Sequence, residues 1–283
     1  MADRDFSVTP CTGGLGAFVS GIDLSVPLDD SRFDDLYATW LEYCVLIFRD
    51  QSLTPATQLA FARRFGTSME KLEFIPAHPE YEDVQVVSTN PDWKPQLFVD
   101  WHTDVSWQEV PTLGAILYCL ERPEGTGDTL WTNMCAVYDA LSEPMQNFLE
   151  GLTGVHDGLL GREASMIAST GAKAFQAARE AYPLVEHPLV AVHPETGRHV
   201  LYVNPLFLSH IKELGREESD ALLSCFYKLS EQPEFQCRLQ WEPGTVALFD
   251  NLSTIHKVVN DYWPRERTMH RIAINAEDRP QGV

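Results

Sequence analysis

Long apolar runs, closely spaced cysteine pairs and an excess of basic residues are all absent from the 283-residue sequence. Because a helix needs about 18 or more consecutive apolar residues to cross a bilayer, we expect no membrane-spanning segment. The N-terminal residues also lack the basic start and apolar stretch of a secretory signal. Lys and Arg total 21 against 41 Asp and Glu, a net charge of −20. Such a charge repels nucleic acid and anionic lipid, so we expect neither as a partner.

The six cysteines are scattered along the chain, and none forms a CxxC pair. This spacing excludes zinc ribbons and thioredoxin-like redox chemistry. Cys44, Cys119 and Cys225 lie inside apolar runs and are predicted to be buried thiols. Unpaired, reduced cysteines are typical of intracellular proteins, so we expect a cytoplasmic location.

No internal repeat, low-complexity tract or linker divides the chain, so we expect one domain over residues 1–283. Apolar periodicity predicts helices over residues 32–43, 55–65, 136–141, 144–152, 172–181 and 217–229. Strands are predicted over residues 6–8, 17–22, 44–48, 84–89, 113–120, 129–132, 236–241, 245–250, 254–259 and 268–275, with a hairpin over residues 189–204. This order predicts a mainly β fold, an antiparallel sandwich or barrel with N-terminal and inserted helices.

Candidate metal ligands emerge when the nine histidines are sorted by their neighbours. Three have an acidic residue two positions later: His78 and Glu80, His102 and Asp104, His193 and Glu195. Residues two apart on a strand share a face, so each pair could offer an imidazole and a carboxylate to one metal. The first and third pairs flank a proline beside turn signals, and we expect them in loops. The middle pair lies in an aromatic, β-prone segment between Trp101 and Trp107, which favours a rigid site.

A facial Fe(II) site needs two imidazoles and one carboxylate. The second histidine should come from a distant strand on the opposite sheet, and the C-terminal region offers His256 and His270. His256 is followed by both Arg267 and Arg271, whereas His270 has only Arg271 close behind it. If two antiparallel strands join around residues 261–267, an arginine at the start of the second strand returns toward the metal. That arginine could pair with a carboxylate of a metal-bound keto acid, which favours His256.

These motifs make the sequence similar to the taurine/α-ketoglutarate dioxygenase family, members of the Fe(II)- and 2-oxoglutarate-dependent oxygenases. The resemblance covers nearly the whole chain. It is carried by WHTD at 101–104, GDTLWT at 127–132 and the pattern D-N-x4-H-x10-R-x3-R at 250–271. The resemblance implies a double-stranded β-helix, or jelly-roll, fold. It also implies Fe(II) as cofactor and 2-oxoglutarate and O2 as co-substrates, with succinate and CO2 as co-products.

The resemblance assigns roles to individual residues near the expected metal. It implies that His102, Asp104 and His256 bind Fe(II) and form the catalytic centre. Thr129 and Arg267 are the implied partners of the distal carboxylate of 2-oxoglutarate.

Three further residues match the substrate positions of the family. Arg271 is the implied partner of an anionic group on the substrate, and Val105 and Phe207 match positions that line the substrate pocket. The substrate is therefore expected to be a small organic anion.

The sequence departs from taurine-cleaving relatives at two places that concern the substrate. Those relatives have a histidine in the loop that corresponds to residues 67–77, where this chain has none but carries Glu70 and Glu73. Phe98 stands where those relatives have an asparagine. Both departures predict an anion that is larger or more apolar than taurine.

The implied activity is hydroxylation of a small anionic organic substrate. A sulfonate such as taurine, which would release sulfite and an aldehyde, is the first candidate. An alkyl sulfate, an aryloxyalkanoate or another carboxylate is the alternative for the same chemistry. A redox-neutral metal hydrolase could use the same ligands without needing Arg267, and O2 consumption would separate the two. A non-catalytic jelly-roll binding module is the third hypothesis, but the three candidate ligands are all present. Association of identical chains is compatible with the sequence.

Overall fold

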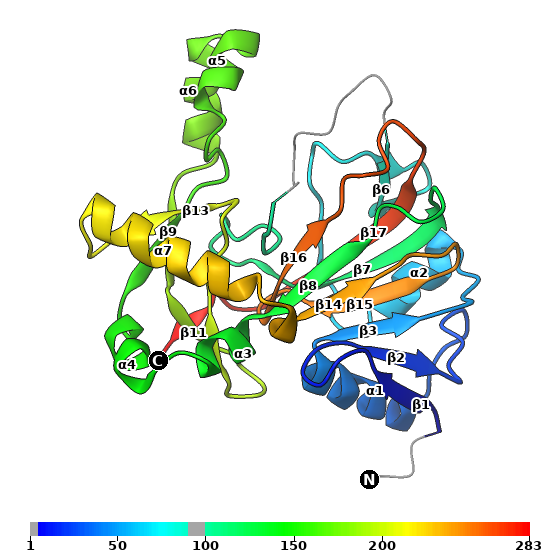
Figure 1. Ribbon diagram of the computed structural model, residues 1–283. Helices are drawn as coiled ribbons and strands as arrows, with labels where there is room; N and C mark the ends of the chain where they lie inside the picture. Colours follow the sequence, from blue (N-terminus) through cyan, green and yellow to red (C-terminus); the bar gives the residue numbers. More distant parts are fainter. Residues whose placement is uncertain (1–4, 90–99) are drawn as a thin grey trace.

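Two facing β-sheets form the centre of the protein in the computed structural model, which describes residues 5–89 and 100–283 (Figure 1). The larger sheet has nine strands, and all neighbours except one parallel pair, formed by its second and third strands, run antiparallel. In spatial order they are β1 (Ser7–Pro10), β2 (Ala17–Ser20), β3 (Val45–Phe48), β15 (Val246–Asp250), β7 (Thr112–Glu121), β17 (Thr268–Asn275), β6 (Tyr81–Ser88) and β5 (Ala77–His78), with β4 (Met69–Glu70) paired to β17.

The smaller of the two facing sheets has three strands in the order β14 (Gln236–Leu239), β8 (Thr129–Asn133) and β16 (Thr254–Val258). His102 adds an isolated antiparallel bridge to His256 at its edge. Apolar side chains from both sheets pack between them, including Trp131 from the smaller sheet and Phe249 and Met269 from the larger one. This arrangement is the double-stranded β-helix that the family resemblance implies.

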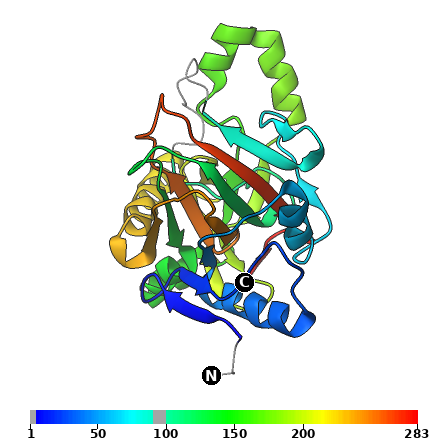
Figure 2. The ribbon, with the colours of Figure 1, turned by 90° about the vertical axis from the view of Figure 1, so that its right-hand side faces the viewer.

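Helices α1 (Asp30–Tyr43) and α2 (Pro55–Ala62) pack on the outer face of the larger sheet (Figures 1 and 2). The Asp29 side chain caps α1, and the Thr54 side chain caps α2 in a reciprocal capping box. The buried Leu36 and Trp40 of α1 belong to the same core cluster as Leu248 of β15. The N-terminal helices therefore close one side of the β core.

A second group of strands and helices covers the side next to the smaller sheet (Figure 1). It contains two three-stranded sheets, β10 (Val185–Pro188), β9 (Thr153–His156) and β13 (Leu208–Ile211), and β12 (His199–Leu201), β11 (Val190–Val192) and β18 (Gln281–Gly282). Its helices are α3 (Met134–Asp139), α4 (Glu143–Leu149), α7 (Arg216–Ser230) and the 3-10 helix η1 (Pro233–Phe235). Val137, Leu201 and Phe226 pack with Ile255 of β16, which joins this group to the β core.

Helices α5 (Glu163–Thr170) and α6 (Ala172–Ala181) form a hairpin that projects from the body in both views (Figures 1 and 2). None of their residues is buried. Among the described residues, no helix combines the length and apolar character needed to cross a bilayer.

The predicted helices and strands all occur, with small shifts of their ends, and the bounds of α6 and β17 agree with the sequence prediction. The hairpin predicted over residues 189–204 is formed by β11 and β12. Helix α5, the 3-10 helix η1 and strands β4, β5, β9, β10, β13 and β18 were not predicted. Helix α5, like α6, buries no residue and has no capping side chain.

Three expectations about the candidate site are wrong. Residues 101–107 are not a strand, since only His102 forms a bridge and a turn follows it. His256 lies beside His102 in one sheet rather than on the opposite sheet. Strands β16 and β17 belong to different sheets, so residues 259–267 cross between sheets instead of joining a hairpin.

The prediction for the cysteines is correct for Cys44 and Cys119, which are buried, and wrong for Cys225, which is exposed. On α7 the buried positions are taken by neighbours such as Leu223 and Phe226, and the helical period turns Cys225 away from them.

Candidate active site

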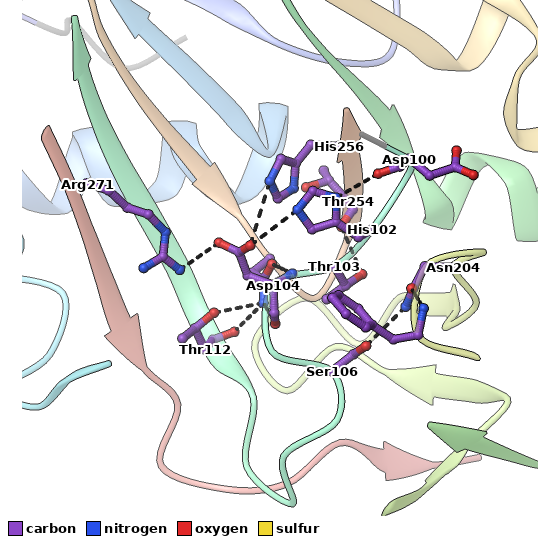
Figure 3. Close-up of polar contacts among 12 residues, drawn as sticks. Asp100, His102, Thr103, Asp104, Ser106, Thr112, Asn204, Thr254, His256 and Arg271 are labelled. Atoms are coloured by element: carbon purple, nitrogen blue, oxygen red, sulfur yellow. Dashed lines mark hydrogen bonds and ion pairs between the residues drawn. The ribbon is translucent and has the colours of Figure 1, made fainter. Parts of the chain in front are cut away.

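Two histidine rings and one carboxylate converge at the edge of the smaller sheet (Figure 3). His102 and His256 exchange backbone hydrogen bonds of 3.0 and 2.8 Å, which places their rings side by side with centroids 4.2 Å apart. Asp104 Oδ1 lies 3.5 Å from His102 Nε2 and 3.8 Å from His256 Nε2. The three potential ligand atoms are all within 4.8 Å of one another.

Asp104 is held in this position by a buried amide from a distant part of the chain. Its backbone N–H donates to Asn251 Oδ1 at 2.8 Å, and Asn251 Nδ2 donates to the Asp104 carbonyl at 2.9 Å. Asn251 Nδ2 also donates to the Thr112 carbonyl at 3.0 Å. Asn251 was not singled out for a role, although it belongs to the D-N-x4-H motif. A side-chain amide can both accept from the Asp104 N–H and donate to the Asp104 carbonyl, which explains the asparagine at position 251.

The preceding Asp250 shapes the turn that leads into His256. Its Oδ1 accepts hydrogen bonds from the backbone N–H groups of Leu252 and Ser253, at 2.8 and 3.0 Å. Its Oδ2 lies 3.0 Å from Nε2 of the buried His193. Burial alone would raise the pKa of Asp250, but the interactions with His193 and the hydrogen bonds from Ser253 together outweigh it and lower that pKa. His193 thus supports the turn and lies apart from the converging ligands.

The protonation of the convergent groups fits metal binding. His102 Nδ1 lies 2.8 Å from the Asp100 carbonyl and donates to it, which leaves Nε2 as the nitrogen that faces Asp104. Burial and the neighbouring His102 lower the pKa of His256 to about 3, which keeps that ring neutral. His256 Nδ1 is buried without a hydrogen-bond partner among the described residues.

Asp104 is ionised, although it is buried. Burial acts to raise the pKa of Asp104, but Arg271 and the two histidines together outweigh it and hold this pKa well below the usual range of a carboxyl group. Donor atoms bound to one metal at about 2.0–2.2 Å lie roughly 3 Å apart, so small movements would close the set around an ion. Two neutral imidazoles and one carboxylate are the donor set of non-haem Fe(II) sites, and the residues fit that ion.

His270, the competing histidine, lies elsewhere. Its ring faces His78 and Tyr118, with centroids 5.8 and 6.4 Å away. Among the described residues, the only cluster with the geometry of a metal site consists of His102, Asp104 and His256.

Arg267 is a buried cation whose charge is not paired with any described carboxylate. It is 6% exposed, its Nε donates to the Gly127 carbonyl at 3.3 Å, and its guanidinium lies 5.3 Å from the centroid of the Tyr262 ring. A Cβ atom at Gly127 would lie 3.0 Å from the Arg267 side chain, so glycine permits this close approach. Because buried charges are normally paired, Arg267 is suited to bind a small anion.

Thr129 lies on the same face of the smaller sheet as His256. It is opposite Val258 across β8 and β16, two positions along from the Trp131–His256 pair. Its Oγ1 accepts a hydrogen bond from Trp241 Nε1 at 2.9 Å, which leaves the hydroxyl hydrogen as a donor. The Thr129 hydroxyl and the buried Arg267 guanidinium are thus both present as hydrogen-bond donors, in the GDTLWT and arginine motifs respectively.

Arg271 reaches the convergent groups from the larger sheet (Figure 3). Its Nη2 donates to Asp104 Oδ2 at 2.9 Å, and its Nη1 donates to Gln85 Oε1 at 2.8 Å. The sequence resemblance gives Arg271 a substrate role but no contact with Asp104 or Gln85. The guanidinium is therefore already oriented by two side chains of the protein.

An apolar wall lies next to the convergent groups. Leu72, Val105, Trp107 and Phe207 form one buried cluster, with Ile75 and Leu206 packed against it. The Phe207 ring meets the His102 ring edge to face at 6.1 Å. Val105 has a φ of 49°, a left-handed conformation that is unusual for a β-branched residue. The two residues assigned to the substrate pocket, Val105 and Phe207, thus belong to one apolar surface.

The other residues of the predicted substrate region have different positions. Glu70 accepts a hydrogen bond from Gln108 Nε2 at 2.8 Å, and Glu73 is exposed. Phe98 lies outside the described residues.

A buried polar cluster behind the apolar wall was missed by the sequence analysis. His156 Nδ1 lies 3.1 Å from Ser106 Oγ, and Asn204 Nδ2 donates to the same oxygen. Asn204 Oδ1 in turn accepts the Phe207 N–H at 2.9 Å. The ring of His187 lies 5.2 Å from that of His156. Scattered singly in the sequence, these residues give no local signal, yet together they hold Ser106 and Phe207 in place.

Comparisons with known proteins agree with this geometry. The family described as "Taurine catabolism dioxygenase TauD, TfdA family" matches residues 7–273. An alkylsulfatase of Acinetobacter baylyi is 32% identical over 281 residues, covering 94% of this chain and 84% of that protein. A (S)-phenoxypropionate/alpha-ketoglutarate-dioxygenase of Sphingobium herbicidovorans is 33% identical over 274 residues, covering 94% of this chain and 92% of that protein. The crystal structure of a taurine dioxygenase from Burkholderia xenovorans is 33% identical and superposes with a TM-score of 0.84, covering 98% of this chain and 91% of that chain.

A jelly roll whose two sheets enclose a His-x-Asp pair and a distant histidine defines the class of 2-oxoglutarate-dependent oxygenases. Within this class, the chain belongs to the TauD/TfdA family of alpha-ketoglutarate-dependent dioxygenases. It is an oxidoreductase that uses Fe(II), 2-oxoglutarate and O2.

The buried histidines behind the apolar wall predict a loss of stability in acid. Burial lowers the pKa of His187 from 6.5 to about 4 and that of His156 well below 6.5. The unfolded chain binds protons on these rings at higher pH than the folded chain does. Their contribution to stability is therefore complete above pH 6.5 and falls as the pH drops toward about 4, by up to about 1.4 kcal/mol per pH unit and ring.

Urea unfolding of the metal-free protein across this pH range measures the effect. Gln in place of His187 can still donate to the Gln108 carbonyl, so His187→Gln should fold and show a smaller decrease in the free energy of unfolding. A pH dependence equal to that of the wild-type protein would contradict the neutral, buried state of His187.

Proposed function

We propose that this dioxygenase hydroxylates a small organic anion with an apolar body, such as a longer sulfonate, an alkyl sulfate or an aryloxyalkanoate. The observation that carries the proposal is the juxtaposition of Arg271 and the apolar wall on two sides of the convergent His102, Asp104 and His256. One side supplies a cation for the anionic group, and the other packs against carbon.

In this proposal, His102, Asp104 and His256 hold Fe(II), and Thr129 and Arg267 bind the distal carboxylate of 2-oxoglutarate. Bound iron, 2-oxoglutarate and O2 would supply the oxidising chemistry, with succinate and CO2 as co-products. The Asp100 carbonyl fixes the His102 tautomer by accepting from Nδ1.

Other residues orient the substrate and exclude water. Arg271 presents its remaining N–H groups to the substrate anion, while Gln85 and Asp104 hold its orientation. Val105 and Phe207 cover the ligands with apolar surface, so a substrate chain packed there would replace water beside the reacting carbon.

The relatives support this class of substrate by their names. One is an alkylsulfatase, one a phenoxypropionate dioxygenase and one a taurine dioxygenase, so an anionic group recurs while the rest of the substrate varies. In this chain the loop of residues 67–77 has no histidine, and Leu72 and Ile75 from that loop pack into the apolar wall. An ammonium group such as that of taurine would meet carbon there. We therefore propose that taurine is a poorer substrate than a longer, apolar anion.

Replacing the proposed metal ligands tests the iron site. His256→Ala should lose Fe(II) affinity by more than the roughly 10- to 100-fold typical of removing an outer-sphere partner, because a direct ligand is removed. His270→Ala, which removes a comparably buried histidine outside the cluster, is the matched control. Iron content and substrate-dependent succinate formation measure both variants. Normal iron binding by His256→Ala, or its loss in His270→Ala, would refute the assignment.

The role of Arg267 predicts a selective effect on the co-substrate. A charge-assisted pair with a carboxylate contributes about 1.5–3 kcal/mol, so Arg267→Ala should raise the 2-oxoglutarate concentration for half-maximal rate by about tenfold or more. The affinity for the organic anion, measured at saturating 2-oxoglutarate, should change much less. An unaltered 2-oxoglutarate requirement would exclude this role.

A homologous series of substrates tests the proposed class. Succinate formation with Fe(II) and 2-oxoglutarate is measured for taurine, 1-butanesulfonate, 1-hexanesulfonate, hexyl sulfate and a phenoxypropionate. Because each buried methylene contributes about 0.8 kcal/mol, kcat/KM should rise by up to about fourfold per methylene until the wall is filled. Strong selectivity for taurine would show that another residue replaces the absent histidine and would overturn the proposal.

A further inference from the structure

A buried glutamine joins the two sides of the proposed substrate site. Gln85 lies on β6, is 1% exposed and stands opposite Arg271 in the antiparallel register. Its Oε1 accepts from Arg271 Nη1 at 2.8 Å, and its Nε2 donates to the carbonyls of Leu72 and Ile75 at 2.8 and 3.1 Å. The side chain thus contacts the anion-binding arginine and the loop that builds the apolar wall.

Only one orientation of the Gln85 amide satisfies these partners. A guanidinium has only donors and a backbone carbonyl only accepts, so the amide oxygen must face Arg271 and the nitrogen must face the loop. A flipped amide would set its NH2 group against the guanidinium and its oxygen against two carbonyls. Because the group is buried, each lost bond would leave a polar atom without a partner.

The two carbonyls belong to a tight turn that presents apolar side chains. The Ile75 N–H donates to the Leu72 carbonyl at 3.0 Å and closes the turn. Leu72 and Ile75 then pack with Val105, Trp107 and Phe207. The Gln85 amide therefore directly connects strand β6 of the larger sheet to the turn that carries Leu72 and Ile75 of the apolar wall.

We propose that Gln85 is a positioning and specificity residue that couples anion binding by Arg271 to the fit of the substrate's apolar body; this inference rests on the proposed substrate class. Asp104 and Gln85 hold the guanidinium at two of its nitrogens, so its direction is set before the anion arrives. A substrate chain that packs on the wall meets a turn anchored by the same side chain. Loss of Gln85 should weaken anion binding and blur chain-length discrimination together.

The chain offers a matched control for this role. Gln51, which follows β3, makes the same set of bonds: its Nε2 donates to the Ile22 and Arg49 carbonyls at 3.1 and 2.9 Å, and its Oε1 accepts from Leu24 N–H at 2.8 Å. Gln51→Leu removes an equivalent tether that touches neither Arg271 nor the wall.

The test measures equilibrium binding of 1-butanesulfonate and 1-hexanesulfonate to the Fe(II)- and 2-oxoglutarate-loaded protein by calorimetry without O2. Gln85→Leu should weaken 1-hexanesulfonate binding by about tenfold or more and reduce the hexane-to-butane affinity ratio. Gln85→Glu should keep the contact with Arg271 but place a carboxylate oxygen against the Leu72 and Ile75 carbonyls, so it should also reduce that ratio. In both variants the dissociation constant of 2-oxoglutarate should stay within about twofold of the wild-type value. In Gln51→Leu the dissociation constants of 2-oxoglutarate and of both sulfonates should all stay within that range.

The possible failures can be told apart. If the wild-type protein binds neither sulfonate, the proposed substrate class fails and this inference falls with it. If the wild-type protein binds them and the Gln85 variants show unchanged affinities and ratio, the inference alone is overturned. An equal loss of 2-oxoglutarate affinity would show a general structural role instead. Should Gln85→Leu fail to fold by circular dichroism, the affinity ratio of Gln85→Glu decides.

Discussion

The buried carboxylate of Asp104 is the constraint on which the rest of the site depends. An ionised group in the interior is stable only when its charge is compensated and its lone pairs are used. Here Oδ1 faces the two histidine rings of the smaller sheet, and Oδ2 accepts from Arg271 of the larger sheet. The carboxylate therefore lies where the two sheets meet, and the compensation of its charge fixes the relative positions of the proposed metal ligands and of Arg271, the proposed anion-binding residue. Removing Arg271 would disturb the proposed iron site as well as the substrate site.

Local strain at the site is held by contacts from far along the chain. A left-handed conformation costs an L-residue about 1–2 kcal/mol, and Val105 adopts one directly after Asp104. The side chain of Asn251, which is 147 residues away from Asp104 in sequence, hydrogen-bonds both the backbone N–H and the backbone carbonyl of Asp104. The Val105 side chain is fully buried in the apolar wall, which offsets part of the cost. The turn points Asp104 toward the histidines and Val105 into the apolar wall beside them, whereas a regular strand would place these two neighbours on opposite faces.

Features of the fold and the site that depend on residues close together in the sequence could be predicted, whereas features that depend on tertiary contacts could not. Strand β17 and helix α6 depend on periodic apolar residues, and their bounds were predicted correctly. The convergence of His102, Asp104 and His256 followed from motif spacing, but the turn at Val105 did not, because it depends on a tertiary contact with Asn251. The Asp104–Arg271 pair and the Gln85 tether were likewise invisible. Each joins strands or loops whose register only the folded chain defines, and a lone buried glutamine has no sequence signature.

The net charge of −20 and the proposed anionic substrate are reconciled by the burial of the two arginines. Exposed acidic groups act through water, where their field is screened over about 8 Å at physiological ionic strength. Arg267 and Arg271 are 6% and 5% exposed, and in such surroundings an ion pair is much stronger than in water. The negative surface therefore slows the approach of anions in general. It does not weaken the binding of an anion that has reached the buried arginines. In the proposed function, selection then depends on which anion can leave water for a site that offers one cation and an apolar wall, and burial of the apolar body of the substrate supplies that free energy.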